Sequence, residues 1–279
     1  MKQTKASEPK VWFITGSSRG FGRVWAEAAL QRGDKVAATA RNVESIADLR
    51  ENYGDHVLTL SLDVTQAAQV EAAVKAAHDY FGKLDVVINN AGYSLVGTVE
   101  EARADEIRLL YETNVLGPVA VIQAVLPIMR EQGYGHILGT SSNLGHFVIP
   151  MIGYYCSSKW AFEAIHESLA TEVKPFGIDV TIVEPGAYAT EFGSPQSLKF
   201  SANLPQYDAL RESVWDSMRN YDRGNPDATA AAILAVVDTP NPPLRLFLGR
   251  ENLDGIKQAY AERIKVWEAW QDVAVAAHG

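Results

Sequence analysis

The sequence predicts an α/β fold, in which a doubly wound parallel sheet of about seven strands carries helices on both faces. Three observations support this prediction. Short β-rich apolar runs alternate with longer helical runs, the alternation continues along most of the 279 residues, and a glycine-rich turn directly follows the first apolar run. No Pro/Ser-rich linker, charge block or repeat divides the chain. We therefore expect a flexible polar tail at 1–10 and a single domain over 11–279.

Strands are expected where apolar residues run almost unbroken, because strands of a parallel sheet are buried on both faces. These runs are 11–15, 35–40, 57–62, 84–89, 136–140, 178–183 and 244–248. Helices are expected between and after them, at 21–32, 43–52, 66–81, 104–131, 152–174 and 227–238. From residue 251 to 279 the pattern predicts a polar C-terminal helix that covers the core or contributes to an interface.

The segment 190–226 interrupts this rhythm, since it is longer than an ordinary connection and mixes aromatic with polar residues. Long insertions in compact domains are usually lids or binding loops. Two interpretations remain open: a lid on the substrate side, or an additional helical pair packed on the core.

Composition and charge restrict the class of partner. A net charge of -9 argues against a nucleic-acid or anionic-membrane surface, because a polyanion would be repelled. The single cysteine, Cys156, excludes an internal disulfide and is expected to be a packed thiol, and the six histidines show no metal-ligand spacing. The polar first ten residues contain no secretion or membrane segment, so a cytoplasmic location is expected.

The glycine-rich turn predicts a dinucleotide site. Glycines let the backbone approach a diphosphate, and the N-terminus of the following helix offers free N–H groups and a favourable dipole. Its position between the first strand and the first helix is where such a loop binds phosphate. The residues expected to contact the cofactor are Gly16, Ser18, Arg19, Gly20, Phe21 and Gly22.

Two tyrosines precede a lysine at the start of the helix expected over 152–174. Residues four apart share a helix face, so Tyr155 neighbours Lys159, whereas Tyr154 points away by about a hundred degrees. A phenol with a pKa of about 10 holds its proton at neutral pH, but an adjacent ammonium favours the phenolate. Tyr155 is therefore the candidate acid/base.

The spacing Thr-Gly-x-x-x-Gly-x-Gly over 15–22 resembles that of the single-domain short-chain dehydrogenases/reductases, a family with a Rossmann-type fold. The larger sugar-nucleotide epimerases usually have shorter glycine spacing. The family's catalytic serine stands thirteen residues before the tyrosine, which implies Ser142 rather than Ser141. Asn114 matches the asparagine that holds a water between the lysine and solvent, and Lys159 would bind the nicotinamide ribose and lower the pKa of Tyr155.

Further matches follow the family's order between Val11 and Thr190. The resemblance implies that Asp63 and Val64 flank the adenine ring and that the chain passes close to the cofactor along Asn90, Ala91 and Gly92. It also implies that Pro185, Gly186 and Thr190 approach the nicotinamide carboxamide.

The end of the second strand indicates which cofactor is used. Enzymes that prefer NAD commonly place a carboxylate there for the ribose 2′-OH, but this chain has Arg41 and Asn42. Two guanidinium groups, those of Arg19 and Arg41, would suit a 2′-phosphate. NADP(H) is therefore expected in preference to NAD(H).

The resemblance implies hydride transfer between nicotinamide and a carbonyl or CH–OH carbon. Reduction is the expected direction, because cells keep NADP mostly reduced. A small-molecule ketone or aldehyde that is bulky or hydrophobic would suit a pocket lined by Phe147, Ile149, Met151, Tyr188 and Phe192. The alternatives are a non-catalytic dinucleotide sensor, or a dehydratase or epimerase on the same fold. A homodimer or homotetramer through the helices at 104–131 and 152–174 is also expected from the resemblance.

Overall fold

The computed structural model describes residues 8–219, 222–250 and 252–279. Most of the tail expected at 1–10 lies outside the described residues, and residues 8–10 lead into the first strand without regular structure.

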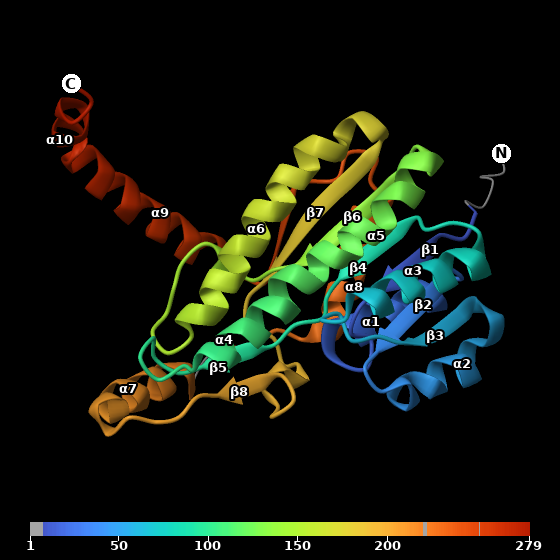
Figure 1. Ribbon diagram of the computed structural model, residues 1–279, viewed down its shortest axis with the longest axis horizontal. Helices are drawn as coiled ribbons and strands as arrows, with labels where there is room; N and C mark the ends of the chain where they lie inside the picture. The colour runs from blue at the N-terminus through green and yellow to red at the C-terminus, as the bar shows by residue number, and fades with distance from the viewer. Residues whose placement is uncertain (1–7, 220–221, 251) are drawn as a thin grey trace.

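The main sheet has seven strands, all parallel, in the order β3-β2-β1-β4-β6-β7-β9 (Figure 1). The predicted doubly wound α/β fold is thereby confirmed. The strands are β1 (Val11–Ile14), β2 (Lys35–Ala40), β3 (Val57–Ser61), β4 (Val86–Asn89), β6 (Gly135–Thr140), β7 (Ile178–Pro185) and β9 (Arg245–Leu248).

Helices cover both faces of this sheet (Figure 1). One face carries α3 (Ala67–Phe81), α4 (Ala104–Tyr111), α5 (Gly117–Gln132) and α6 (Gly153–Val173). The other face carries α1 (Gly20–Gln31), α2 (Ala47–Tyr53) and α8 (Thr229–Asp238).

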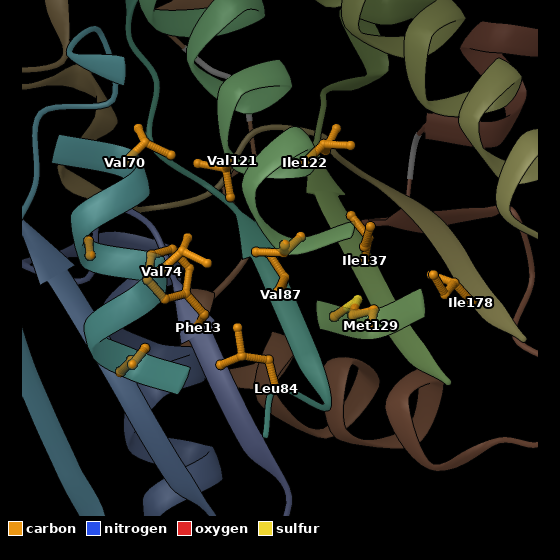
Figure 2. Close-up of a cluster of buried hydrophobic side chains, with 14 of the residues drawn as sticks. Phe13, Val70, Val74, Leu84, Val87, Val121, Ile122, Met129, Ile137 and Ile178 are labelled. Atoms are coloured by element: carbon orange, nitrogen blue, oxygen red, sulfur yellow. The ribbon is translucent and has the colours of Figure 1, made fainter. Parts of the chain in front are cut away.

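Side chains of successive strand residues point to opposite faces of the sheet, so each face has its own hydrophobic core. Phe13 of β1 packs with α3 and α5 in the cluster of Figure 2, while its neighbours Trp12 and Ile14 pack towards α1 and α8. Successive strand residues point to opposite faces, so an unbroken apolar run is what a sheet covered on both sides requires.

The helical stretch expected over 104–131 is continuous but not uniform. A π-helical turn, Glu112–Leu116, separates α4 from α5 and contains Asn114. Ala104–Gln132 has the length and apolar composition of a membrane span, although Val121, Val125 and Met129 are buried against the sheet, as a core helix requires. The π-turn shifts the register of the helix at Asn114.

The segment 190–226 forms neither a plain loop nor a helical pair, so the second of the two interpretations was wrong. Its described residues contain β8 (Leu198–Phe200), which pairs in parallel with β5 (Ser94–Val96), one α-helix, α7 (Asp208–Arg219), and short 3-10 turns at Glu191–Gly193 and Pro205–Tyr207. Arg211 of α7 bonds the buried carboxylate of Glu101 at 2.8 Å. The segment is thus attached to the turn that follows β5.

The C-terminal region forms α9 (Asn252–Ala269) and α10 (Gln271–Ala276), where the sequence predicts one helix. Figure 1 shows these two helices leaving the body of the molecule, with the C-terminus at the far end.

Candidate active site

The site residues expected from the sequence come together at the carboxyl ends of the strands. The strand order reverses direction between β1 and β4, since β2 and β3 extend to one side and β6, β7 and β9 to the other. Such a reversal opens a crevice outside the strand ends, which is where open α/β sheets bind ligands.

The glycine loop has the backbone that a phosphate site needs. Gly16 and Gly20 have φ values of 71° and 56°, a left-handed conformation in which a side chain is strained. A Cβ on Gly22 would lie 2.3 Å from the carbonyl oxygen of Gly16. Helix α1 begins at Gly20, so its free N–H groups point at this cradle. Ser18 lies in the same loop and is partly buried.

Asn90 braces this loop. Its Nδ2 donates to the carbonyl oxygens of Thr15 and Gly16, each at 3.1 Å, and its backbone N–H donates to the Thr15 hydroxyl at 2.9 Å. The backbone N–H of Ala91 reaches the same hydroxyl at 3.0 Å. Asn90, which the sequence assigned to the cofactor, thus holds the glycine loop in shape. Thr15, which was not among the predicted site residues, accepts or shares most of these hydrogen bonds.

The two arginines assigned to the 2′-phosphate differ in their surroundings. Arg41 directly follows β2 and is exposed. Arg19 precedes α1, and its Nη2 donates to the Ser197 hydroxyl at 2.9 Å, close to β8. Arg19 therefore also ties the glycine loop to the 190–226 segment.

The end of β3 presents the pair assigned to the adenine. The Asp63 carboxylate accepts from the backbone N–H and the hydroxyl of Thr65, at 3.0 and 2.8 Å, which shapes the turn after the strand. Val64 is buried, and a Cβ on Gly117 would meet its side chain at 2.8 Å. The pair therefore occupies a rigid corner between β3 and α5.

The turn after β7 closes the crevice opposite the glycine loop. A Cβ on Gly20 would lie 3.7 Å from that of Thr190, and the Phe21 ring meets Tyr188 edge to face at 5.2 Å. Pro185 ends β7, and the backbone N–H of Gly186 donates to the Leu248 carbonyl at 3.0 Å. The structure thus brings this turn and the glycine loop together.

Tyr155 lies in the first turn of α6 and is almost fully buried. Burial raises the pKa of its phenol well above the ordinary value, and hydrogen bonding with Ser142 acts in the opposite direction. Ser142 itself donates to Asn143 Oδ1 at 3.1 Å. The serine and the tyrosine chosen from the sequence therefore face each other, and the phenol holds its proton at neutral pH.

Lys159 is one turn further along α6, and its ammonium group lies 5.7 Å from the centre of the Tyr155 ring. It donates to the Thr140 carbonyl oxygen at 2.8 Å. Burial lowers the pKa of Lys159 to about 8. A weakly held proton on a buried ammonium suits a group that takes part in proton exchange.

Asn114 stands beside the lysine across a glycine. A Cβ on Gly92 would lie 3.2 Å from Asn114 Oδ1 and 4.0 Å from Lys159 Nζ. Asn114 Nδ2 donates to the carbonyl of Tyr93 at 2.9 Å and to the Ser158 hydroxyl at 3.1 Å. Its side chain is therefore held by protein groups inside the π-turn, a kind of irregularity that is frequent at functional sites.

The neighbouring Tyr154 and Cys156 have other surroundings. The Tyr154 hydroxyl donates to the Val99 carbonyl at 3.2 Å, so this residue fixes a loop. Cys156 is fully buried and burial raises the pKa of its thiol, in agreement with a packed role.

The five residues expected to line one substrate pocket lie in separate parts of the structure. Phe192 lies 5.8 Å from the Tyr155 ring, centre to centre, and Met151 is buried. Ile149 is partly buried in the same loop as Met151. Phe147 instead lines a groove beside α9, and Tyr188 packs on Phe21. A single pocket lined by all five was therefore a wrong expectation.

A buried charged cluster lies next to the loop that carries Ser142, and the sequence spacing gave no sign of it. His146 Nε2 is 2.8 Å from Glu184, and ligand atoms of His146, Glu163 and Glu184 lie within 4.8 Å of one another. Arg245 Nε is 3.3 Å from both carboxylates. The guanidinium offsets part of the negative charge of these two carboxylates, and the arrangement is a salt-bridge network.

Comparison with known proteins agrees with this geometry. The family model for the short chain dehydrogenases matches residues 10–199. The chain belongs to the short-chain dehydrogenase family. It is 39% identical to Oxidoreductase BOA17 of Botryotinia fuckeliana over 271 residues, which are 96% of this chain and 98% of that protein. A short-chain dehydrogenase from Streptomyces avermitilis has a TM-score of 0.90 at 38% identity, covering 97% of this chain and 99% of its own.

Solved relatives of this short-chain dehydrogenase carry either nicotinamide cofactor. An alcohol dehydrogenase from Thermococcus sibiricus, with a TM-score of 0.72 and 30% identity, is complexed with 5-hydroxy-NADP and covers 86% of this chain and 96% of its own. A 3-ketoacyl-(acyl-carrier-protein) reductase from Brucella melitensis, with a TM-score of 0.73 and 26% identity over the same shares, is complexed with NADH. The chain is thus an oxidoreductase of a family that binds nicotinamide dinucleotides.

Proposed function

We propose that this short-chain dehydrogenase is an NADP(H)-dependent reductase of bulky or hydrophobic ketones and aldehydes. The observation that carries the proposal is the buried Tyr155 phenol, which faces Ser142 and has the Lys159 ammonium one helical turn away. When bound, the nicotinamide supplies or accepts the hydride.

The chain's own groups have distinct tasks in this scheme. Ser142 and Tyr155 hydrogen-bond the substrate oxygen, and Tyr155 gives that oxygen a proton as the carbonyl becomes an alcohol. Burial keeps the phenol protonated, which favours the reductive direction. Lys159, whose pKa is lowered to about 8, returns a proton to the phenolate and is itself resupplied along Asn114.

The cofactor preference rests on the end of β2. Arg41 is exposed there and Asn42 follows it, so a 2′-phosphate would meet a cation and no carboxylate at these two positions. Gly16, Gly20 and the start of α1 fit the diphosphate, because both glycines have a left-handed backbone and the first turn of α1 offers free N–H groups to the loop.

The substrate class rests on Phe192 and its segment. The Phe192 ring lies against Tyr155 and is 39% exposed, so it can cover an apolar group attached to the reacting carbon. Arg19 and Glu101 fasten the 190–226 segment to the glycine loop and to the turn after β5. We propose that this segment is the substrate-side lid, and that the enzyme acts in the cytoplasm.

A dehydratase or epimerase would use an additional acid or base at the pocket. Glu184, the carboxylate directly before Pro185, is fully buried and paired with His146 and Arg245. It is therefore engaged in the salt-bridge network, which favours the reductase over these alternatives.

The test is to measure cofactor oxidation with aldehydes, bulky ketones and keto esters, using NADPH and NADH in parallel. We expect faster oxidation of NADPH, with kcat/KM rising with the apolar size of the ketone. Oxidation of neither cofactor, together with tight NADPH binding, would instead support a dinucleotide sensor.

A further inference from the structure

Glu163 is a buried acidic residue for which the proposed catalytic scheme has no task. It lies in α6, four residues beyond Lys159, and the two residues are 5% and 6% exposed. Residues four apart on a helix lie on the same face, with about 5–6 Å between their Cβ atoms. Tyr155, Lys159 and Glu163 therefore follow one another along one buried face of α6.

The Glu163 carboxylate is confined beneath the loop that carries Ser142. A Cβ on Gly145, at the end of the 3-10 turn after Ser142, would lie 2.8 Å from Glu163 Cγ and 3.0 Å from Oε1. Neither carboxylate oxygen of Glu163 has a hydrogen-bond partner among the described residues. Buried polar groups are usually hydrogen-bonded, so an unbonded carboxylate at this place requires an explanation.

The charges that face Glu163 from other elements leave an excess of negative charge. Arg245 of β9 lies 3.3 Å from Glu163, but it also lies 3.3 Å from Glu184 of β7 and 2.8 Å from Glu167. His146 Nε2 is 2.8 Å from Glu184, on the far side of the pair of carboxylates. One guanidinium thus serves three carboxylates, and the charge of Glu163 is only partly neutralised.

Lys159 lies in surroundings that otherwise disfavour its positive charge. Its ammonium group is 5.2 Å from the centre of the Phe162 ring and donates to the Thr140 carbonyl oxygen. His166, one turn beyond Phe162, is buried, and burial lowers its pKa to about 4, so it is neutral. Burial also lowers the pKa of Lys159, while the charge of Glu163 acts in the opposite direction.

We propose that Glu163 is a positioning residue for the proton of Lys159: its carboxylate, one helical turn away, holds that proton on the ammonium group and so sets the upper pH limit of carbonyl reduction. The inference rests on the proposed function, in which Lys159 returns a proton to the Tyr155 phenolate. A negative charge close to a buried ammonium stabilises its protonated form.

The order in which the two groups titrate fits this role. Burial, and then the charge of Glu184, raise the pKa of Glu163 to about 7, whereas the pKa of Lys159 is about 8. Glu163 is therefore already ionised in the pH range where Lys159 begins to lose its proton. If Glu163 served only to fasten Arg245, its removal would lower stability and leave the titration of Lys159 unchanged.

The first experiment is the pH profile of kcat at saturating NADPH. We expect the alkaline limb of Glu163→Gln to fall at a pH about one unit lower than in the parent. Glu163→Asp, which restores a carboxylate, should recover part of this shift. Glu167→Gln is the matched control, since it removes an exposed carboxylate of the same helix that also pairs with Arg245, and it should keep the parent profile.

A second variant covers the possibility that the buried amide of Glu163→Gln is not tolerated. Glu163→Met also removes the charge, and apolar residues of similar volume often replace buried ionised groups without loss of stability. We expect the same shift of the alkaline limb in this variant. Circular dichroism at each pH shows that the compared proteins are folded.

A titration without turnover separates this proposal from the proposed function. In protein with isotopically labelled lysine, the NMR signal of Lys159 is the one that disappears in Lys159→Arg, and its midpoint should be about one pH unit lower in Glu163→Gln and Glu163→Met than in the parent. A chain that reduces no carbonyl compound would refute the proposed function, and this midpoint would still decide the coupling. Equal midpoints, or a shifted midpoint with an unchanged kcat profile, would overturn the proposal.

Discussion

The Asn143 amide donates to the Asn252 side-chain oxygen at 3.1 Å, across 109 residues of chain. Asn143 in turn accepts from the hydroxyl of Ser142. At the other side, Asn252 Nδ2 donates to the backbone carbonyls of Leu248 and Glu184. The loop of the proposed catalytic serine is thus held by the first residue of the C-terminal helix.

We predict that Asn252→Ala lowers kcat with little change in the KM for NADPH. The substitution leaves the Asn143 amide without its partner, so the Ser142 hydroxyl loses its fixed orientation. Unsatisfied buried groups cost about 1–3 kcal/mol each, and we expect a comparable loss in the free energy of unfolding. Steady-state kinetics and thermal unfolding check both parts. Asn225→Ala, which removes the turn bond of another asparagine to Asp227, is the control.

Tyr155→Phe is predicted to reduce kcat by at least about a hundredfold while NADPH still binds, because the ring remains and the proton donor is lost. Tyr154→Phe is the matched control, since it removes a hydroxyl one residue away that donates to the Val99 carbonyl. Fluorescence titration measures cofactor binding. Turnover within a few-fold of the parent in Tyr155→Phe would refute the assigned role.

Local patterns predicted the centre of this site well. The spacing of Tyr155 and Lys159 on one helix, and of the glycines in one loop, is set by geometry within a few residues, and the structure places these groups together. The seven parallel strands followed in the same way from unbroken apolar runs.

Contacts between distant segments were not accessible from the sequence. Arg19 reaches Ser197 across 178 residues, and Asn252 reaches Asn143 across 109. A polar residue has no periodic signal that indicates its partner, so these contacts depend on how the elements pack. The parallel pairing of β5 with β8 was missed for the same reason, because each strand has only three residues.

Arg41→Asp should change the cofactor preference. Loss of a guanidinium and gain of a carboxylate at the end of β2 remove hydrogen bonds to a 2′-phosphate and offer an acceptor to a ribose hydroxyl. We expect kcat/KM for NADPH to fall by about 10- to 100-fold and that for NADH to rise. Arg50→Asp, the same change on an exposed position of α2, should leave the ratio of the two values unaltered. An unchanged ratio in Arg41→Asp would contradict the NADP(H) assignment.

The buried carboxylate of Glu163 predicts a pH dependence of stability. Burial, and then the nearby charge of Glu184, raise the pKa of Glu163 to about 7, while Ser141, Arg245 and His146 act in the opposite direction. The native state therefore binds a proton more tightly than the unfolded state, whose glutamate has an ordinary pKa of about 4.3.

The sign of the effect follows from proton linkage. Between the unfolded and the native pKa the native state holds more protons, so the free energy of unfolding falls as the pH rises from about 4.3 to about 7. The parent should lose on the order of 3 to 4 kcal/mol of unfolding free energy over this range because of Glu163, and Glu163→Gln, which cannot ionise, should not show this loss. Urea unfolding at several pH values measures the slope for the parent, for Glu163→Gln, and for Glu167→Gln, an exposed neighbour that also pairs with Arg245. An equal slope in the parent and in Glu163→Gln would show that Glu163 is ionised across the whole range.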